Sequence, residues 1–249
     1  MGTRRAVQQL RSLVGSVGGL RPERRTADVG ARHAEWSIIA SSDDLVPRPS
    51  EHLLDVAVAA IQRTRKVDTS ALEARCATLE DKTYVRTWPG EHYRLLPGLC
   101  EVLKPEVAVE IGTFTGLGAL ALAQVCPRVV TFDLLPWESF GTTALREADF
   151  TGTGVEQRLG DLSDPSIFAG ERDLLAQADL IFVDGPKDGR FEPAFLQLLL
   201  PVVRETGAFL VFDDIRVVPM VRFWRELDMP KLDLTSFGHW SGTGLACAR

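Results

Sequence analysis

Short apolar runs alternate with helical stretches over the second half of the chain, and this alternation limits the fold more than any other feature. Alternation of this kind predicts a parallel sheet with helices on both faces. Near the C-terminus "KLDLTSF" and "GTGLACA" flank "GHWS", which predicts a closing antiparallel pair. We therefore predict an α/β, doubly wound, mostly parallel sheet of seven strands with an antiparallel final strand. The first five predicted strands are Val107–Ile111, Val129–Phe132, Val155–Leu159, Leu180–Val183 and Phe209–Phe212.

The chain before the first predicted strand has a different pattern. In residues 51–104, apolar residues recur at steps of three and four, which predicts N-terminal helices that pack on the sheet domain at 105–249. Residues 1–50 lack such a pattern and carry arginines among apolar residues. They form either a membrane or organelle address or, as we expect, a partly flexible arm. The helical region could also provide a homodimer contact.

The composition and charge of the chain limit the classes of molecule that it can bind. The 249 residues carry a formal charge of −6, so the chain lacks the positive field that nucleic-acid binders use against phosphates. We expect a small-molecule partner and no nucleic acid. No apolar run approaches the roughly 18 residues of a membrane span, and we expect a cytoplasmic protein. Four scattered cysteines argue against a zinc site or a disulfide framework.

Glycines follow the first predicted strand in "VAVEIGTFTGLGALALAQV". At a strand-to-helix turn, Gly112, Gly116 and Gly118 would let backbone approach a ligand closely, and the helix N-terminus would add amide donors. A dinucleotide fingerprint requires G-x-G-x-x-G, whereas three residues separate Gly112 from Gly116, so no pyrophosphate cradle is predicted. The alternative is that these glycines serve only a tight turn.

Acids follow the other predicted strands. Asp133, after the second strand, could accept the hydroxyls of a ribose, and Asp161 follows the third strand. The fourth and fifth end in "LIFVDGPKDG" and "FLVFDDI", so Asp184 should meet Asp213 and Asp214 at one edge of a parallel sheet if these two strands are neighbours. Carboxylates that close repel one another unless a cation neutralises them, and oxygen-only ligands favour Mg²⁺, Mn²⁺ or Ca²⁺. Alternatively, each aspartate caps the helix that follows it.

These motifs carry a family resemblance. The pattern Glu110-x-Gly112-x-x-x-Gly116 resembles motif I of class I S-adenosylmethionine-dependent methyltransferases. "VDGPKDG" with "LVFDDI" resembles the paired signature of cation-dependent O-methyltransferases, the group containing the catechol and caffeoyl-CoA enzymes. "WPGEHYRLL" and "LTSFGHWSGTGL" are similar to bacterial small-molecule methyltransferases. The resemblance implies a Rossmann-like, S-adenosylmethionine-binding domain at 105–249.

The resemblance also implies roles for single residues. Lys187 would be the base that takes the substrate proton, with its pKa lowered beside a cation, and His239 is a second catalytic candidate. Asp214 stands where the family has Asn, and no tyrosine follows Lys187 in the familiar place. The metal ligands would be Asp184, Asp213 and Asp214, preferably around Mg²⁺. The cofactor-binding residues would be Glu110, Gly112, Thr113, Gly116, Gly118, Asp133, Asp161 and Asp184.

Two histidines outside the acidic motifs could border the site. His92 lies in "WPGEHYRLL" and His239 in "FGHWSGTG", the latter with Trp240 as part of a substrate wall. A structural or solvent-exposed histidine is the commoner outcome for each. The predicted function is a divalent-metal-dependent O-methyltransferase that uses S-adenosylmethionine to modify a small-molecule hydroxyl. The alternatives are a metal-independent methyltransferase with Lys187 or a histidine as base, and a nicotinamide-dependent oxidoreductase.

Overall fold

The computed structural model describes residues 49–76, 85, 92–152 and 154–248. The arm predicted at 1–50 lies outside the described residues apart from its C-terminal end. Residues 46–249 belong to one compact unit. The division of that unit into a helical region and a sheet domain stays a prediction.

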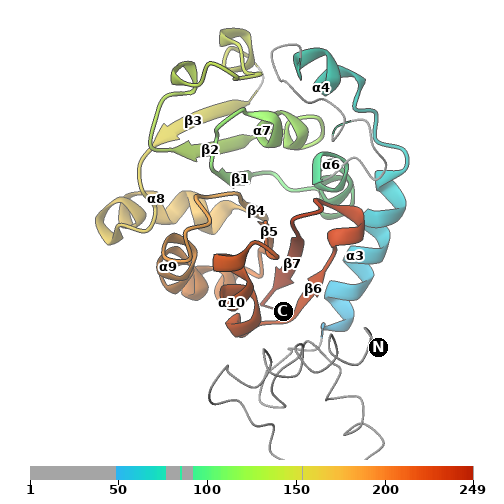
Figure 1. Cartoon of the computed structure of the whole chain (residues 1–249), viewed down its shortest axis with the longest axis vertical. Helices are drawn as coiled ribbons and strands as arrows, with labels where there is room; N and C mark the ends of the chain where they lie inside the picture. The colour runs from blue at the N-terminus through green and yellow to red at the C-terminus, as the bar shows by residue number, and fades with distance from the viewer. Residues whose placement is uncertain (1–48, 77–84, 86–91, 153, 249) are drawn as a thin grey trace, which may run out of the picture. The chain divides into compact units, whose positions relative to one another are not determined.

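The described part of the chain builds a sheet of seven strands in the order β3-β2-β1-β4-β5-β7-β6 (Figure 1). β1 to β5 are parallel, and β7 pairs antiparallel with both β5 and β6. This confirms the predicted α/β fold, including the antiparallel closing pair. The strands are β1 (Ala108–Ile111), β2 (Val129–Asp133), β3 (Val155–Leu159), β4 (Leu180–Val183), β5 (Phe209–Asp213), β6 (Lys231–Asp233) and β7 (Thr243–Cys247).

Helices cover both faces of the sheet (Figure 1). Alternate residues of β1 enter two separate cores: Ala108 packs in the cluster with the N-terminal helices and α7, and Val109 in the cluster with α8, α9 and α10. Burial on both faces explains why the central strands β4 and β5 are almost continuously apolar. The helices are α3 (Glu51–Thr64), α4 (Ser70–Arg75), α6 (His92–Leu103), α7 (Leu117–Leu122), α8 (Pro165–Gln177), α9 (Phe191–Thr206) and α10 (Val218–Glu226), with short 3₁₀ turns η2 (Trp137–Ser139), η3 (Glu147–Asp149) and η4 (Thr235–Phe237).

The register of the strands places their carboxyl ends side by side. Ile111 pairs with Phe132 on one side and with Val183 on the other, and Val183 pairs with Phe212. The loops that leave β1, β2, β4 and β5 therefore emerge next to one another. Among the helices that the structure describes, none combines the length and the apolar character that a membrane crossing requires.

Candidate active site

The loops after β1 and β4 touch through their backbones. Gly112 has a φ of +100°, and a Cβ atom there would overlap the carbonyl oxygen of Asp184. Its N–H donates to the carbonyl of Phe132 at 2.8 Å, while the N–H of Asp184 donates to the carbonyl of Ile111 at 2.8 Å. Position 112 therefore needs glycine for its conformation and for the close approach of the Asp184 loop.

Glu110 lies beneath the glycine loop, in the core, with 1% of its surface exposed. Thr131 Oγ1 donates to its carboxylate at 2.6 Å, and a Cβ atom at Gly118 would overlap its Oε1. Burial raises the pKa of Glu110 well above its ordinary value, and the hydrogen bond from Thr131 opposes that rise only in part. Glu110 and Gly118 thus fit each other inside the protein and support the loop from below.

A chain of hydrogen bonds extends from Glu110 to the loop surface. The hydroxyls of Thr131 and Thr113 lie 2.8 Å apart, and Gln157 Nε2 donates to Thr113 Oγ1 at 3.1 Å. Gln157 also accepts from the N–H of Trp137 at 2.9 Å. Gln157 was not among the residues expected from the sequence, although a polar residue in the middle of β3 was a usable signal.

Gly116 occupies the N-cap of α7 with a φ of +75°. A Cβ atom there would overlap the side chain of Leu145. In the described structure this glycine is covered by Leu145, which belongs to the segment between β2 and β3. The position of Leu145 therefore decides how much of the α7 N-terminus a ligand can reach.

The acids after β2 and β3 differ in what they contact. Asp133 Oδ2 accepts from the N–H of Phe114 in the glycine loop at 3.1 Å, and its Oδ1 accepts from Leu134 N at 2.7 Å. Asp161 Oδ1 accepts from the backbone and the hydroxyl of Ser163, at 2.9 and 2.6 Å. Asp133 thus joins the loop after β1, whereas Asp161 caps its own turn.

Asp184, Asp213 and Asp214 converge at the ends of β4 and β5. Their ligand atoms all lie within 4.8 Å of one another. Lys187 Nζ forms an ion pair with Asp184 and lies 3.3 Å from Asp214 Oδ2. Asp213 is 4% exposed, and its Oδ1 has no hydrogen-bond partner among the described residues.

The electrostatics of this cluster are strongly coupled. Burial, followed by the charge of Asp213, raises the pKa of Asp184 to about 6. Burial would raise the pKa of Asp213 as well, but His92 and His239 outweigh it and hold that pKa below its ordinary value. Burial lowers the pKa of Lys187, yet Asp184 in particular outweighs it, so the net pKa is raised. This differs from the lowered pKa expected for a base, because the lysine faces the carboxylates of Asp184, Asp213 and Asp214.

Two histidines complete the surroundings of Asp213. His92 opens α6, is 2% exposed, and its Nδ1 lies 3.5 Å from Asp213 Oδ1. His239, just before β7, has its Nδ1 at 3.6 Å from Asp213 Oδ1 and at 3.4 Å from Asp214 Oδ1. The hydroxyl of Ser241 lies 2.5 Å from His239 Nδ1 and donates to Asp214. Both histidines considered from the sequence therefore border the acidic cluster.

The donor set fits a divalent cation. Three carboxylates face a single ammonium, and one buried carboxylate oxygen has no hydrogen-bond partner among the described residues. Neighbouring carboxylates repel one another, and a cation between them would relieve that repulsion. Asp184, Asp213 and Asp214 could supply oxygen ligands to that cation.

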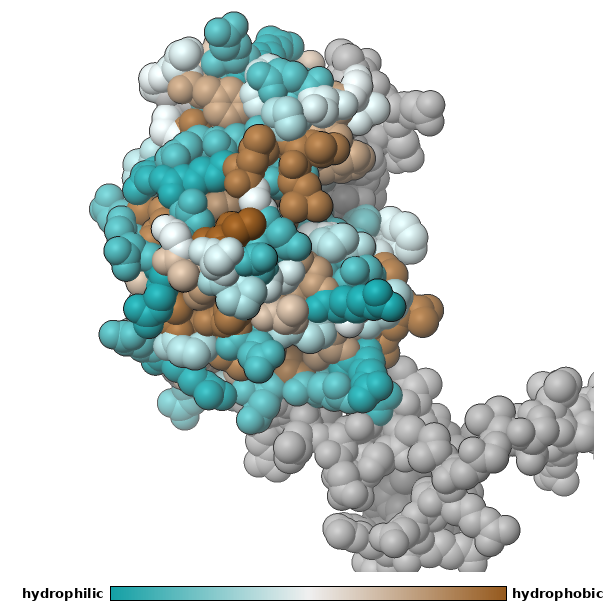
Figure 2. All heavy atoms as spheres, turned by 90° about the vertical axis from the view of Figure 1, so that its left-hand side faces the viewer, coloured by the Kyte–Doolittle hydropathy of each residue, from teal (hydrophilic) through white to brown (hydrophobic). Residues whose placement is uncertain are grey.

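An apolar rim surrounds the carboxyl edge of the sheet. Val218, after β5, is 87% exposed, and Trp240, before β7, is 80% exposed. Figure 2 looks onto the side toward which the arrowheads of β2 and β3 point in Figure 1, and hydrophobic atoms gather there among hydrophilic ones. The other members of the rim at the strand ends are Phe114, Leu134, Leu135 and Leu159. Exposed apolar residues gathered in one region are a feature of ligand-binding surfaces.

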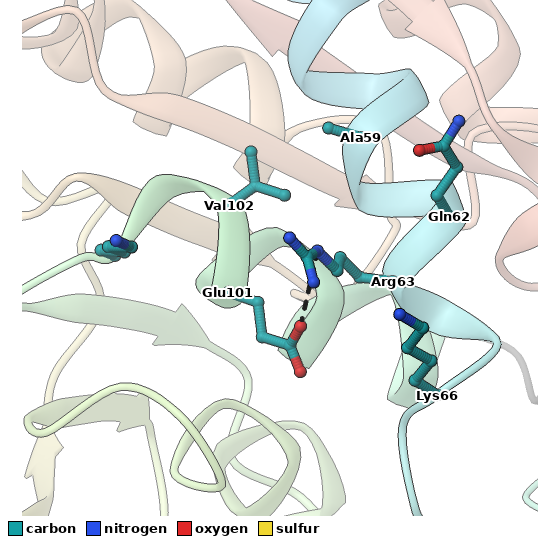
Figure 3. A pocket seen from close by; sticks show the side chains of 7 residues that line it. Ala59, Gln62, Arg63, Lys66, Glu101 and Val102 are labelled. Carbon is teal, nitrogen blue, oxygen red and sulfur yellow. Dashed lines mark ion pairs between the residues drawn. The ribbon is translucent and has the colours of Figure 1, made fainter.

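A separate hollow lies between α3 and α6 (Figure 3). It is lined by Arg63 of α3, by Lys66 just after that helix, and by Glu101 and Val102 of α6. Arg63 Nε lies 3.8 Å from Glu101 Oε2. These α6 residues lie at the opposite end of the helix from His92. The hollow therefore lies away from the acidic cluster.

Comparisons with known proteins agree with the fold. Residues 109–215 match the family model of a methyltransferase domain. A candidate caffeoyl-CoA O-methyltransferase from Staphylococcus aureus shares the fold with a TM-score of 0.51 and 14% identity, over 79% of this chain and 100% of that one. No curated protein matches the sequence significantly.

Two further solved structures are similar at TM-scores below one half. An O-methyltransferase from Bacillus cereus, in complex with S-adenosylhomocysteine, has a TM-score of 0.47 and 19% identity over 82% of this chain and 94% of that one. The O-methyltransferase TomG from Streptomyces achromogenes, involved in tomaymycin synthesis and in complex with S-adenosylmethionine, has a TM-score of 0.45 and 22% identity over 82% of this chain and 92% of that one.

Proposed function

Because residues 109–215 match the model of a methyltransferase domain and lie on a seven-stranded α/β sheet, we propose that this chain is a class I S-adenosylmethionine-dependent methyltransferase that methylates a hydroxyl group of a small molecule with the help of a divalent cation. The observation that carries the proposal is the buried Asp213 oxygen without a hydrogen-bond partner among the described residues, set between two more carboxylates and Lys187. In open α/β sheets, ligands bind outside the carboxyl ends of the strands, and this cluster lies there.

The glycine loop and Asp133 are the proposed cofactor site. Gly112 keeps side-chain atoms out of the space between the β1 and β4 loops, and Asp133 is anchored by the N–H of Phe114. A carboxylate in this position can accept hydrogen bonds from the hydroxyls of a ribose. Phe114, exposed on the same loop, lies in an edge-on contact with Phe140 and extends the apolar rim toward the cofactor.

Lys187 is the proposed proton acceptor. Methyl transfer to oxygen is an in-line displacement, in which a carbon–oxygen bond forms while the carbon–sulfur bond breaks and the hydroxyl proton leaves. A cation held by Asp184, Asp213 and Asp214 would lower the pKa of a hydroxyl next to it. Burial already acts to lower the pKa of Lys187, and Asp184 opposes it. Carboxylates that share their charge with a cation would oppose burial less, so Lys187 could accept the proton.

The acceptor we propose has an apolar body and neighbouring oxygens. Adjacent oxygens would be suited to a divalent cation, and the rim that includes Trp240 and Val218 offers apolar contact. The exposed rim thus supports a small molecule that carries a diol on an apolar or aromatic frame.

A second candidate function is methyl transfer without a metal. Lys187 Nζ already contacts both Asp184 and Asp214, so an ammonium could neutralise the cluster in place of a cation. In that case Lys187 would position carboxylates, and His239 would be the base. Chelation separates the two candidates.

The test follows S-adenosylhomocysteine release from S-adenosylmethionine with a panel of aromatic vicinal diols, with added Mg²⁺ or Mn²⁺ or with excess EDTA. We expect EDTA to abolish turnover and an Asp184→Ala variant to lose it while S-adenosylmethionine binding, measured by calorimetry, largely survives. Lys187→Ala should keep both cofactor and metal binding. Full turnover in excess EDTA would instead support the metal-independent candidate.

A further inference from the structure

Nitrogen ligands stand beside the carboxylate that anchors the proposed cation site. His92, Asp213 and His239 form a second group whose ligand atoms all lie within 4.8 Å of one another, and Asp213 is shared with the carboxylate cluster. His92 comes from α6, Asp213 from the end of β5, and His239 from the turn before β7. Two imidazoles and one carboxylate are thus gathered from three distant segments.

The distances suit ligands of one ion. At metal–ligand bonds of about 2.1 Å, neighbouring ligand atoms lie about 3.0 Å apart in an octahedron and about 3.4 Å apart in a tetrahedron. The Nδ1 atoms of His92 and His239 lie 3.5 and 3.6 Å from Asp213 Oδ1, and His239 Nδ1 lies 3.4 Å from Asp214 Oδ1. Only small side-chain movements would bring these atoms onto one cation.

We propose that His92 and His239 ligate the cation together with Asp213, so that the centre selects a first-row transition ion such as Mn²⁺, Fe²⁺ or Co²⁺ over Mg²⁺ and Ca²⁺. Imidazole nitrogen suits transition ions, whereas carboxylate, carbonyl and water suit Mg²⁺ and Ca²⁺. Two histidines with one carboxylate form a known ligand set of iron(II) sites. This inference rests on the proposed cation site and revises the preference for Mg²⁺ that the acidic motifs alone suggested.

The same contacts allow a different role for the histidines. Ser241 donates to Asp214 and lies 2.5 Å from His239 Nδ1, so His239 could orient carboxylates from outside the metal's coordination sphere. Loss of an orienting residue weakens every divalent ion about equally, since it disturbs the carboxylates that all of them use. Loss of a nitrogen ligand weakens transition ions selectively.

The experiment measures metal affinity in the full-length protein after removal of metal with EDTA. CoCl₂ is titrated with visible absorption as the signal, and MgCl₂ is titrated by competition against bound Mn²⁺, followed by electron paramagnetic resonance. The variants are His92→Gln and His239→Gln, which preserve polarity in a buried position, and the matched control is His52→Gln on the exposed side of α3. Circular dichroism confirms that each variant is folded.

We expect His239→Gln and His92→Gln each to lower Co²⁺ affinity about 10- to 100-fold while Mg²⁺ affinity changes less than about threefold, and His52→Gln to change neither. The Co²⁺ absorption bands should also shift in the two variants. Equal losses for Co²⁺ and Mg²⁺, or an unchanged Co²⁺ spectrum, would overturn the proposal. If the wild-type protein binds no divalent ion, the proposed cation site itself is wrong. All of these measurements report metal binding, and none depends on methyl-transfer activity.

If His92→Gln fails to fold, His239→Gln alone decides the question, because its side chain lies at the partly exposed end of the cluster. An Asp213→Asn variant gives the lower limit of metal affinity. It removes the carboxylate shared by the histidine group and the aspartate group, so it should abolish binding of both Co²⁺ and Mg²⁺.

Discussion

At the scale of single residues, the site depends on two glycines whose missing side chains leave space for neighbouring groups. Gly112 and Gly118 leave space for the Asp184 backbone and for the Glu110 carboxylate. Gly112 has a positive φ as well as a crowded surrounding, whereas at Gly118 only the lack of space excludes a side chain. Substitutions at the two positions should therefore fail for different reasons.

Gly118→Ala should destabilise the protein by about 2–3 kcal/mol, because the new methyl group would displace the buried Glu110 carboxylate from Thr131. Urea unfolding measures the loss. A Gly170→Ala substitution is the control, since nothing lies within 4 Å of a Cβ atom there. Equal stability of the Gly118 and Gly170 variants would contradict the packing argument.

Glu192 holds the loop that contains Lys187 and should make the stability of the protein depend on pH. Its side chain is buried, its Oε1 accepts from the N–H of Lys187 at 2.9 Å, and Lys187 there has a φ of +53°. Burial raises the pKa of Glu192. An acid whose pKa is raised by folding binds more protons in the folded state, so it costs stability as pH rises above its unfolded value of about 4.3.

Glu192→Gln should therefore flatten the fall in melting temperature between about pH 5 and pH 8, because the amide oxygen can still accept from Lys187 without being charged. Glu192→Ala removes the acceptor and should lower the melting temperature at every pH. Thermal unfolding by circular dichroism across that range measures both. A steeper pH dependence in the Gln variant would contradict the assignment.

At the scale of secondary-structure elements, β6 and α10 are joined by a buried lysine. Lys231, the first residue of β6, donates from Nζ to the carbonyls of Arg225 at 3.1 Å and Leu227 at 2.8 Å, and also to that of Trp224. These carbonyls lie at the C-terminal end of α10, where the last carbonyls of a helix accept hydrogen bonds from groups outside it. A cation at a helix C-terminus also interacts favourably with the helix dipole.

Lys231→Met should lower stability by about 2–3 kcal/mol, since the apolar stem is kept but buried carbonyls lose their donor. The matched control is Arg222→Ala on the exposed side of the same helix, whose ion pair with Glu226 lies in water and should contribute little. Urea unfolding of both variants gives the comparison. A Lys231→Met variant as stable as the control would show that water replaces the ammonium.

At the scale of the whole molecule, seven strands covered on both faces bring distant segments to one edge. α6 packs in the same core as β4 and β5, which is why His92 reaches the end of β5. The loops after β1 and β2, which we propose to bind the cofactor, and the acids after β4 and β5 thereby share one edge of the sheet. A ligand bound there stabilises the whole folded unit by mass action.

S-adenosylhomocysteine at about 100 times its dissociation constant should stabilise the protein by about 2.7 kcal/mol, which raises the melting temperature of a domain this size by roughly 5–10 °C. NAD⁺ at the same concentration should have no effect, because the glycine spacing offers no pyrophosphate cradle. Thermal unfolding with each ligand measures this, and stabilisation by NAD⁺ alone would favour the oxidoreductase alternative.

The succession of strands and helices follows from the amino-acid sequence alone, and the convergence of the acids follows from it in part. Parallel strands share a carboxyl edge, so the sequence places Asp184, Asp213 and Asp214 together if the fourth and fifth strands are neighbours, and the structure shows that these strands pair. The burial of Glu110 was not predicted from the sequence, which placed this residue at the cofactor site. Its fit against Gly118 became visible only in the structure.

The surroundings of those acids depend instead on tertiary packing. No periodicity links α6 to the end of β5 or to the turn before β7, so the meeting of His92, Asp213 and His239 depends on how whole elements pack. Likewise, contact between Leu145 and Gly116 depends on the path of a segment without regular pattern. Local sequence dictates local conformation, whereas the chemical character of the centre arises from contacts between residues distant along the chain.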